Sequence, residues 1–194
     1  NEADLAVELG CARVTVNRAL RTLAEMGLLD RRRKAGTRVA LHPVGKATLS
    51  IPLIRSEIEA AGKSYRYHLL GQQIEPAPAA VTQQFALEAG AKLLHVTALH
   101  EADETPYVIE DRWINTTLMP HLTEVSFARL SANEWLLQNT PFTHGDINFG
   151  AKNASQREAQ LLATKTDTAL FVISRTTWDQ NAALTMVELV FHPG

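Results

Sequence analysis

The chain has 194 residues, of which 45% are hydrophobic, and its formal net charge is −2. Its single cysteine, Cys11, excludes an internal disulfide framework and indicates a reducing compartment such as the cytoplasm. No apolar run approaches the roughly 20 residues of a membrane span, so the composition predicts a protein without a membrane partner. Its length allows one good core and a small second one.

The charge is distributed unevenly along the chain. Residues 1–40 carry eight basic against five acidic side chains, whereas the remaining 154 residues carry eleven against sixteen. Local rather than net charge governs attraction to phosphate. The first forty residues are therefore the segment in which contact with nucleic acid is expected.

This basic segment predicts two short helices followed by a hairpin. "NEADLAVELG" has Asn1 as its cap, acids in its first turn and Gly10 as its stop. In "RVTVNRALRTLAEMG", an apolar stripe of Val16, Leu20 and Leu23 indicates a second helix. "LLDRRRKAGTRVAL" then alternates around "KAG", which is typical of a β-hairpin. Together these elements predict a winged helix-turn-helix.

The polar side chains of the second helix and the hairpin are the candidates for DNA contact. Arg and Asn pair bidentately with guanine and adenine edges, and basic side chains on a hairpin meet phosphates. Any one of these arginines alone would be an ordinary solvated charge, but the order of the elements favours DNA binding. The predicted contacts are Arg13, Thr15, Asn17 and Arg18 in the helix, and Arg32, Arg33, Lys34 and Gly36 in the hairpin.

Beyond a Pro- and Gly-containing linker, strands alternate with short helices. Strands are predicted at 65–75, 92–102, 106–115, 142–152 and, as a hairpin turning at 179–182, at 169–192. Helices are predicted at 54–63, 76–90, 131–139 and 155–164. Because most of these strands are joined by hairpins, the pattern predicts an antiparallel sheet with flanking helices in an α+β fold.

Residues 1–40 resemble the winged-helix head of GntR-type bacterial transcription regulators. The shared pattern falls on Asn1-Glu2, Leu5-Ala6, Ala12-Arg13, Thr15-Val16, Ala19-Leu20, Leu23 and Gly27. The resemblance implies a further helix before Asn1, so an exposed apolar face is expected on the helices present. It implies a winged helix-turn-helix domain at 1–41 without its first helix, and a linker at 42–50.

Residues 51–194 resemble the UTRA effector-binding domain, whose fold is that of chorismate lyase. The fragments "IEDRWIN", "NEW", "RTTW" and the closing "HPG" are similar to histidine-utilisation repressors of the HutC type. That resemblance implies a homodimeric repressor that binds double-stranded operator DNA and is released by urocanate. No cofactor and no metal are implied.

Two other classes of function compete with this one. The domain can instead sense another small carboxylate or a sugar phosphate, but the positions at which phosphate-sensing relatives offer arginines are Ala98 and His100 here. Without an arginine pair, a phosphate loses its charge-assisted partners. The other alternative is a chorismate-lyase-like enzyme. The predicted DNA-binding head argues against it, because a lyase has no use for one. The seven scattered histidines show no metal-ligand spacing.

Strand parity indicates the centre of the effector site. Side chains two apart on a strand share a face, so Val108, Glu110 and Arg112 are expected to point together. Glu110 corresponds to a pocket glutamate of the relatives. We expect it to accept the imidazole N–H of urocanate and Arg112 to hold the carboxylate, so that Arg112→Ala folds but no longer responds. The alternative is that the two residues pair with each other across solvent.

The resemblance adds further candidates around this pair. Asn133 and Trp135 correspond to lid positions, although a tryptophan at helical spacing also suits a core. His100 is either a neutral hydrogen-bond partner of the ligand or a satisfied, half-buried histidine. The complete predicted effector site consists of Arg55, His100, Glu110, Arg112, Asn133, Trp135, His144 and Glu188.

Overall fold

The computed structural model describes residues 2–25, 29–32, 36–39 and 53–194. The chain divides into two compact units, Asn1–Pro52 and Leu53–Gly194, which we call the head and the body. The predicted linker at 42–50 lies outside the described residues. None of the helices that the structure describes has the length and apolar character needed to span a bilayer.

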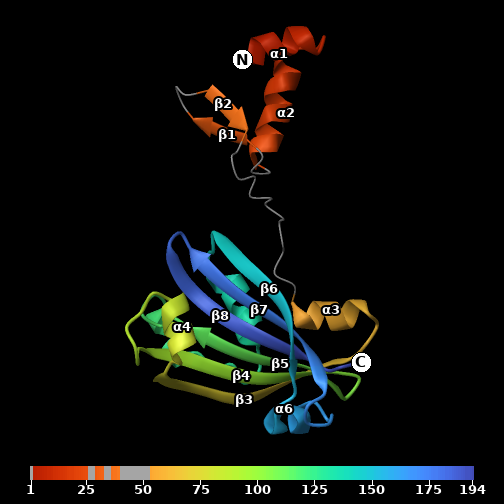
Figure 1. The fold of residues 1–194 in the computed structure, drawn as a ribbon, viewed down its shortest axis with the longest axis vertical. Helices are drawn as coiled ribbons and strands as arrows, with labels where there is room; N and C mark the ends of the chain where they lie inside the picture. Colours follow the sequence, from red (N-terminus) through yellow and green to blue (C-terminus); the bar gives the residue numbers. More distant parts are fainter. Residues whose placement is uncertain (1, 26–28, 33–35, 40–52) are drawn as a thin grey trace. The chain divides into compact units, whose positions relative to one another are not determined.

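The head contains the predicted pair of helices and the predicted hairpin (Figure 1). Helix α1 (Glu2–Glu8) and helix α2 (Arg13–Glu25) are joined by a turn in which Gly10 has a φ of +61°, a conformation that glycine adopts without steric cost. Strands β1 (Leu29–Arg32) and β2 (Gly36–Val39) pair antiparallel. The helix-turn-helix and the hairpin that follows it are therefore confirmed.

The head buries little apolar surface among its described residues. Ala6 of α1 and Val16 of α2 are buried, whereas Leu23 of the predicted stripe is 36% exposed. Val7 and Val14 are 83% and 79% exposed, so the expected exposed apolar face is present.

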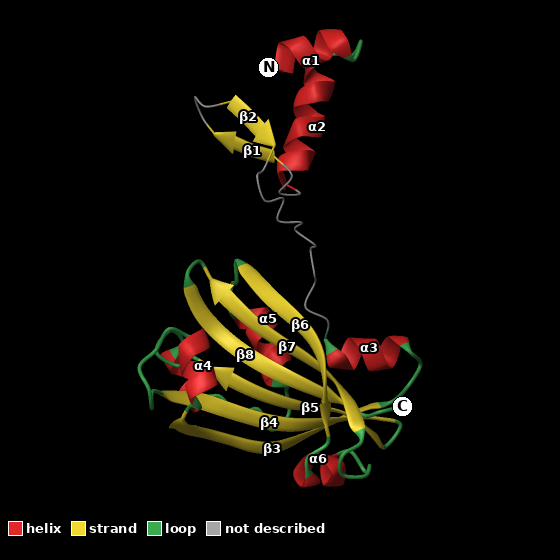
Figure 2. Cartoon of the chain, viewed as in Figure 1, coloured by secondary structure: helices red, strands yellow, loops and turns green. Residues whose placement is uncertain are grey.

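The body is a six-stranded antiparallel sheet with short helices (Figures 1 and 2). Its strands are β3 (Tyr65–Pro76), β4 (Lys92–Ala102), β5 (Thr105–Ile114), β6 (His144–Asn153), β7 (Ala169–Asp179) and β8 (Ala182–Phe191), in the order β3-β4-β5-β8-β7-β6. Its helices are α3 (Ile54–Ala60), α4 (Ala79–Gln84), the 3₁₀ helix η1 (Pro120–Glu124), α5 (Ala132–Asn139) and α6 (Gln156–Leu161). The predicted α+β class is confirmed.

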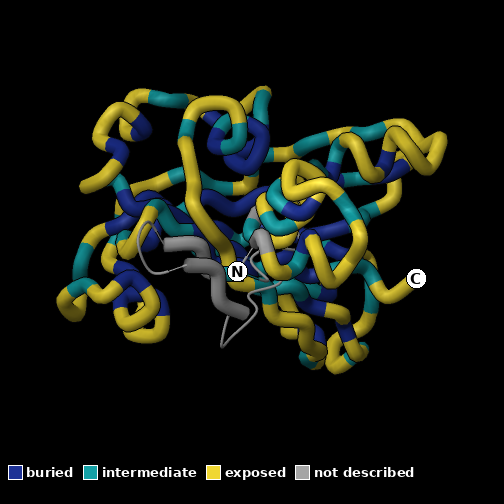
Figure 3. Tube along the Cα trace, turned by 90° about the horizontal axis from the view of Figure 1, so that it is seen from above, coloured by how far each residue is buried: buried dark blue, intermediate teal, exposed yellow. Residues whose placement is uncertain are grey.

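Each face of the sheet is covered by two sets of helices. Helix α3 packs at one end of one face, and η1 and α5 pack at the other end of the same face; we call it the α3–α5 face. Helices α4 and α6 cover the two ends of the opposite face, the α4–α6 face. Figure 3 shows that buried residues lie mainly inside the body and exposed residues mainly along its outside.

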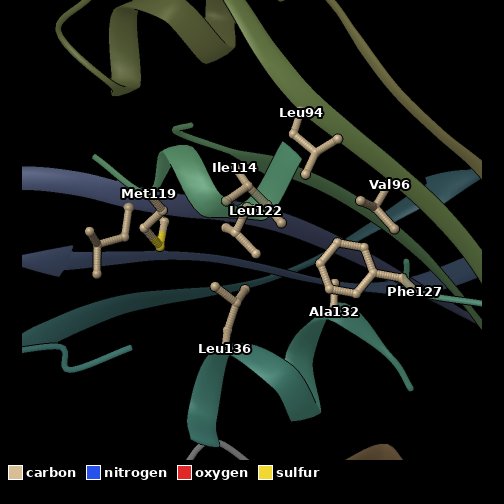
Figure 4. Packing of buried hydrophobic residues seen from close by; sticks show 9 residues of the cluster. Leu94, Val96, Ile114, Met119, Leu122, Phe127, Ala132 and Leu136 are labelled. Carbon is tan, nitrogen blue, oxygen red and sulfur yellow. The ribbon is translucent and has the colours of Figure 1, made fainter. Parts of the chain in front are cut away.

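The largest apolar cluster fixes α5 against the sheet (Figure 4). Phe127 and Leu122, both fully buried, fill the space between the strands and Leu136 of α5. Ser131 caps α5 by accepting a hydrogen bond from the backbone N–H of Glu134. This packing determines where Asn133, in the first turn of α5, is placed.

One predicted helix is shorter in the structure, and one helix is present that the sequence did not predict. The helix predicted at 76–90 is only α4, because Ala86 adopts a φ of 52° and the Leu87 N–H bonds back to the Thr82 carbonyl. This left-handed ending turns Leu87 onto the cluster around Phe85. The 3₁₀ helix η1 was not predicted. Elsewhere the boundaries agree within a few residues, and both predicted hairpin turns, at 103–105 and 179–182, are present.

Candidate functional site

A row of polar side chains crosses the middle of the α3–α5 face, between its two apolar ends. His100 comes from β4, Glu110 and Arg112 from β5, and Arg175 from β7, while Asn133 reaches them from α5. All five are at least 95% buried. Polar groups at this depth require partners. We call these five residues the buried polar cluster.

Glu110 is the centre of the cluster. Its Oε1 accepts a hydrogen bond from Arg112 Nε at 2.5 Å, and its Oε2 lies 3.0 Å from His100 Nε2. The parity argument that placed Glu110 and Arg112 on one face is confirmed. The two residues also pair with each other, as in the alternative interpretation, but both are 1% exposed, so the pair is buried and does not face solvent.

Arg112 uses all three of its nitrogen atoms within the cluster. Besides Glu110, Nη1 donates to Thr185 Oγ1 at 3.3 Å and Nη2 donates to Asn133 Oδ1 at 3.1 Å. Its neighbour Arg175 donates from Nη2 to the same Asn133 oxygen at 2.8 Å. Asn133 therefore joins two guanidinium groups from different strands.

Two tyrosines and an ion pair border the cluster. Tyr65 Oη lies 2.9 Å from His100 Nδ1, and the Tyr67 ring meets the His100 ring edge-on at 5.3 Å. Arg55 of α3 lies over the Tyr65 ring and donates to Glu134 of α5 at 3.0 Å. This ion pair links α3 to α5, the helices at the two ends of the α3–α5 face.

The electrostatics of the cluster are unbalanced. Burial alone would raise the pKa of Glu110, but the Arg112 guanidinium and the His100 hydrogen bond outweigh it and lower the pKa to about 2. Burial, followed by repulsion from Arg112, lowers the pKa of Arg175 to about 9. Glu110 is thus a carboxylate at neutral pH and Arg175 stays charged. The five residues hold two cations against one anion.

Several predicted site residues are in this cluster or beside it, and others are not. His100, Glu110, Arg112 and Asn133 meet, and Arg55 lies at the border. Trp135 packs against the apolar cluster of Figure 4, which agrees with its alternative interpretation as a core residue.

Glu188 and His144 are separated from the cluster. Glu188 lies on the α4–α6 face, where it bonds to Lys152 and lines a cleft beside α6. His144 is exposed and stacks on Trp178, whose contacts are with the α4 end of that same face. The prediction that these two residues join Glu110 in one site is therefore corrected. The reason is strand parity. Glu188 is opposite Ser174 and lies between Val187 and Leu189, whose side chains pack on the α3–α5 face, so the Glu188 side chain points to the opposite face.

Sequence reasoning missed Arg175, Tyr65 and Tyr67. A signal for each was present. Arg175 is a charged residue within the otherwise uncharged strand stretch "LFVISRTTW", and Tyr65 and Tyr67 alternate on one face of β3.

The predicted DNA contacts are distributed over α2 and the hairpin. Arg13, Thr15 and Arg18 are exposed on α2, and Asn17 is half-buried. Arg32 ends β1 and Gly36 begins β2, whereas Arg33 and Lys34 lie outside the described residues.

Comparison with known families matches both units. The model of the UTRA domain matches residues 60–194, and the model of bacterial regulatory proteins of the gntR family matches residues 1–39. Histidine utilization repressors of Pseudomonas aeruginosa and Pseudomonas putida are each 32% identical over the whole of this chain, which spans 77% and 78% of their lengths. That of Klebsiella aerogenes is 30% identical, with 80% of its length covered.

Solved structures show the same fold. The C-terminal domain of the histidine utilization repressor from Pseudomonas syringae pv. tomato superposes with a TM-score of 0.63 at 22% identity, covering 67% of this chain and 92% of that domain. PhnF from Mycobacterium smegmatis superposes with a TM-score of 0.66 at 22% identity, covering 100% of this chain and 86% of PhnF.

Proposed function

Because the chain belongs to the GntR family of bacterial transcription regulators, in the UTRA-containing group of the histidine utilization repressors, we propose that urocanate is its effector and binds at the buried polar cluster. The chain is a transcriptional repressor with an effector-binding domain and is not an enzyme. We expect the repressor to control genes of histidine utilization and to act in the cytoplasm.

The charge of the buried polar cluster is the observation that supports this effector. Two guanidiniums face one carboxylate, with Glu110 ionised and Arg175 lacking an acidic hydrogen-bond partner. A buried charge without a counter-charge is costly. One carboxylate on a ligand would balance the cluster, whereas a phosphate dianion would exceed it. Urocanate carries one carboxylate and an imidazole. The imidazole N–H can donate a hydrogen bond to a remaining lone pair of Glu110.

We propose that α2 reads operator DNA. Arg13, Thr15 and Arg18 are exposed on one helix of a helix-turn-helix, the element that enters the major groove in such modules. The effector can release the DNA only if it binds the DNA-free state more tightly than the DNA-bound state.

The expected result is concentration-dependent release of DNA by urocanate. A duplex selected by the protein from a random library would be labelled, and its release followed by fluorescence anisotropy. Histidine, imidazole propionate and glucosamine 6-phosphate serve as comparison ligands. Release by glucosamine 6-phosphate and not by urocanate would establish the sugar-phosphate alternative.

We also propose that the repressor is a homodimer formed through the body. Strand β6 is an edge of the six-stranded sheet, and most of its residues are exposed. Phe149 of β6 (68% exposed) stacks with Phe171 of the neighbouring strand β7 (48% exposed) at 6.2 Å between ring centroids. Exposed apolar edge strands invite pairing with another chain, and a dimer would present two recognition helices to two half-sites.

Sedimentation velocity tests this assembly. The wild-type protein is expected to sediment as a dimer at micromolar concentration and Phe149→Asp as a monomer, because the substitution places a charge in the apolar contact. Leu118→Asp is the matched control, since Leu118 is 45% exposed but lies outside β6. A wild-type monomer, or a Phe149→Asp dimer, contradicts the proposal.

A further inference from the structure

Two buried side-chain atoms at the polar cluster have no hydrogen-bond partner. They are Arg175 Nε and the Tyr67 hydroxyl, the only two such atoms in the part of the chain that the structure describes. A buried donor left unsatisfied loses the hydrogen bond it would make to water in the unfolded chain, so native proteins rarely contain one without a reason. That both occur at the same cluster indicates that a ligand completes it.

The two atoms lie on different sides of the Glu110–Arg112 pair and differ in chemistry. Arg175 extends from β7, beyond β8, and is cationic. Tyr67 extends from β3, beyond β4, and is accompanied there by the rings of Tyr65 and His100. The cluster therefore has a cationic side and an aromatic side.

We propose that Arg175 Nε binds the carboxylate of the effector and that the Tyr67 hydroxyl binds its ring, so that the effector lies across the cluster with its anionic end toward β7. This inference rests on the proposed function in placing the effector at the cluster. It also assigns Arg112 a different role from the one expected from the sequence. Arg112 is a positioning residue that holds Glu110 and Asn133.

The hydrogen bonds distinguish the two arginines. Arg112 has a partner on each of its nitrogen atoms, one of which is the carboxylate of Glu110 at 2.5 Å. Arg175 bonds to the neutral amide oxygen of Asn133, and its Nε is left over. A guanidinium attracts a carboxylate most strongly when no other anion neutralises it. The geometry thus favours Arg175 as the anion contact.

Calorimetric binding of urocanate and its uncharged methyl ester tests the orientation. The wild type is expected to prefer urocanate over the ester by a factor on the order of 100, because the ester lacks the negative charge that pairs with the buried guanidinium. In Arg175→Gln this preference is expected to fall below about 3-fold, whereas Arg175→Lys, which keeps the charge, retains part of it. Tyr67→Phe is expected to weaken both ligands equally, by about 10-fold for one hydrogen bond.

The matched control is Arg157→Gln, which removes an exposed arginine of α6 on the opposite face and is expected to change neither affinity. An unchanged preference in Arg175→Gln would overturn the assignment. So would a Tyr67→Phe protein that weakens only urocanate, because the hydroxyl would then contact the carboxylate.

The stability of the ligand-free protein shows whether Arg175 is a contact for the effector anion or a residue that stabilises the fold. A structural arginine is destabilising to remove, whereas Arg175 carries an unsatisfied donor and no acidic partner. Arg175→Gln is therefore expected to leave the urea midpoint unchanged or to raise it. A lower midpoint together with an unchanged ligand preference would make Arg175 a structural residue.

A separate result would show that urocanate is not the effector. If neither urocanate nor its ester binds the wild type, urocanate is not the effector, and sodium formate becomes the probe of the anion contact. Relative to sodium chloride at equal ionic strength, formate is expected to raise the melting temperature of the wild type and of Arg157→Gln but not of Arg175→Gln. Equal rises in all three proteins would overturn the inference.

Discussion

Arg112→Ala is expected to lower the free energy of unfolding by about 3–5 kcal/mol, the cost of breaking a buried ion pair. The substitution leaves Glu110 buried at 1% exposure without its cation, and it removes donors from Asn133 and Thr185. From the sequence, this variant is expected to fold and to lose only its response. The structure changes that expectation, because the pair is inside the body.

Urea denaturation checks this cost against two further variants. Arg66→Ala removes an arginine that is 55% exposed and pairs with Glu101 and Glu104, so it is expected to cost at most about 1 kcal/mol. Adding Glu110→Gln to Arg112→Met is expected to recover most of the loss, since Glu110 is then no longer a buried carboxylate without its cation. Equal losses in Arg112→Ala and Arg66→Ala would show that the pair contributes no more than a surface one.

The fold could be predicted from the sequence where local signals and burial agree. Alternation in "VTALHEA" and "VIEDRWI", joined by a two-residue turn with Asp103 and Glu104 at positive φ, determines the β4–β5 hairpin. Periodicity failed for the helix predicted at 76–90, because it could not show that Leu87 leaves the helical path to join the Phe85 cluster. That choice is made by tertiary packing.

The site could be predicted in part for the same reason. Parity along β5 placed Glu110 beside Arg112, since both lie on one strand. The contribution of Arg175 depends on β8 lying between β5 and β7, an order that no local pattern gives. Parity also separates Glu188 from the cluster, but only once its register opposite Ser174 is known. Residues on one strand are thus predictable, whereas residues from different strands require the topology.

The pH dependence of stability is the second large effect expected from the cluster. Arg112 and His100 outweigh the effect of burial and lower the pKa of Glu110 from 4.5 to about 2. A carboxyl group with a lowered folded-state pKa contributes stability above its unfolded-state pKa, and this contribution is lost as the pH falls toward the folded-state value. The wild type is therefore expected to lose about 2 kcal/mol from this residue between neutral pH and about pH 3.

Urea midpoints at neutral pH and at about pH 3 measure this loss by difference. Other carboxylates also titrate in this range, but they do so equally in Glu110→Gln, which lacks only the Glu110 contribution. The stability of Glu110→Gln is thus expected to be lower than wild type at neutral pH and to depend less on pH. Glu59→Gln, which replaces a half-exposed glutamate of α3, is expected to follow the wild type. Parallel pH profiles for all three proteins would mean that Arg112 and His100 do not lower the pKa of Glu110 in the folded protein, and this prediction would then be wrong.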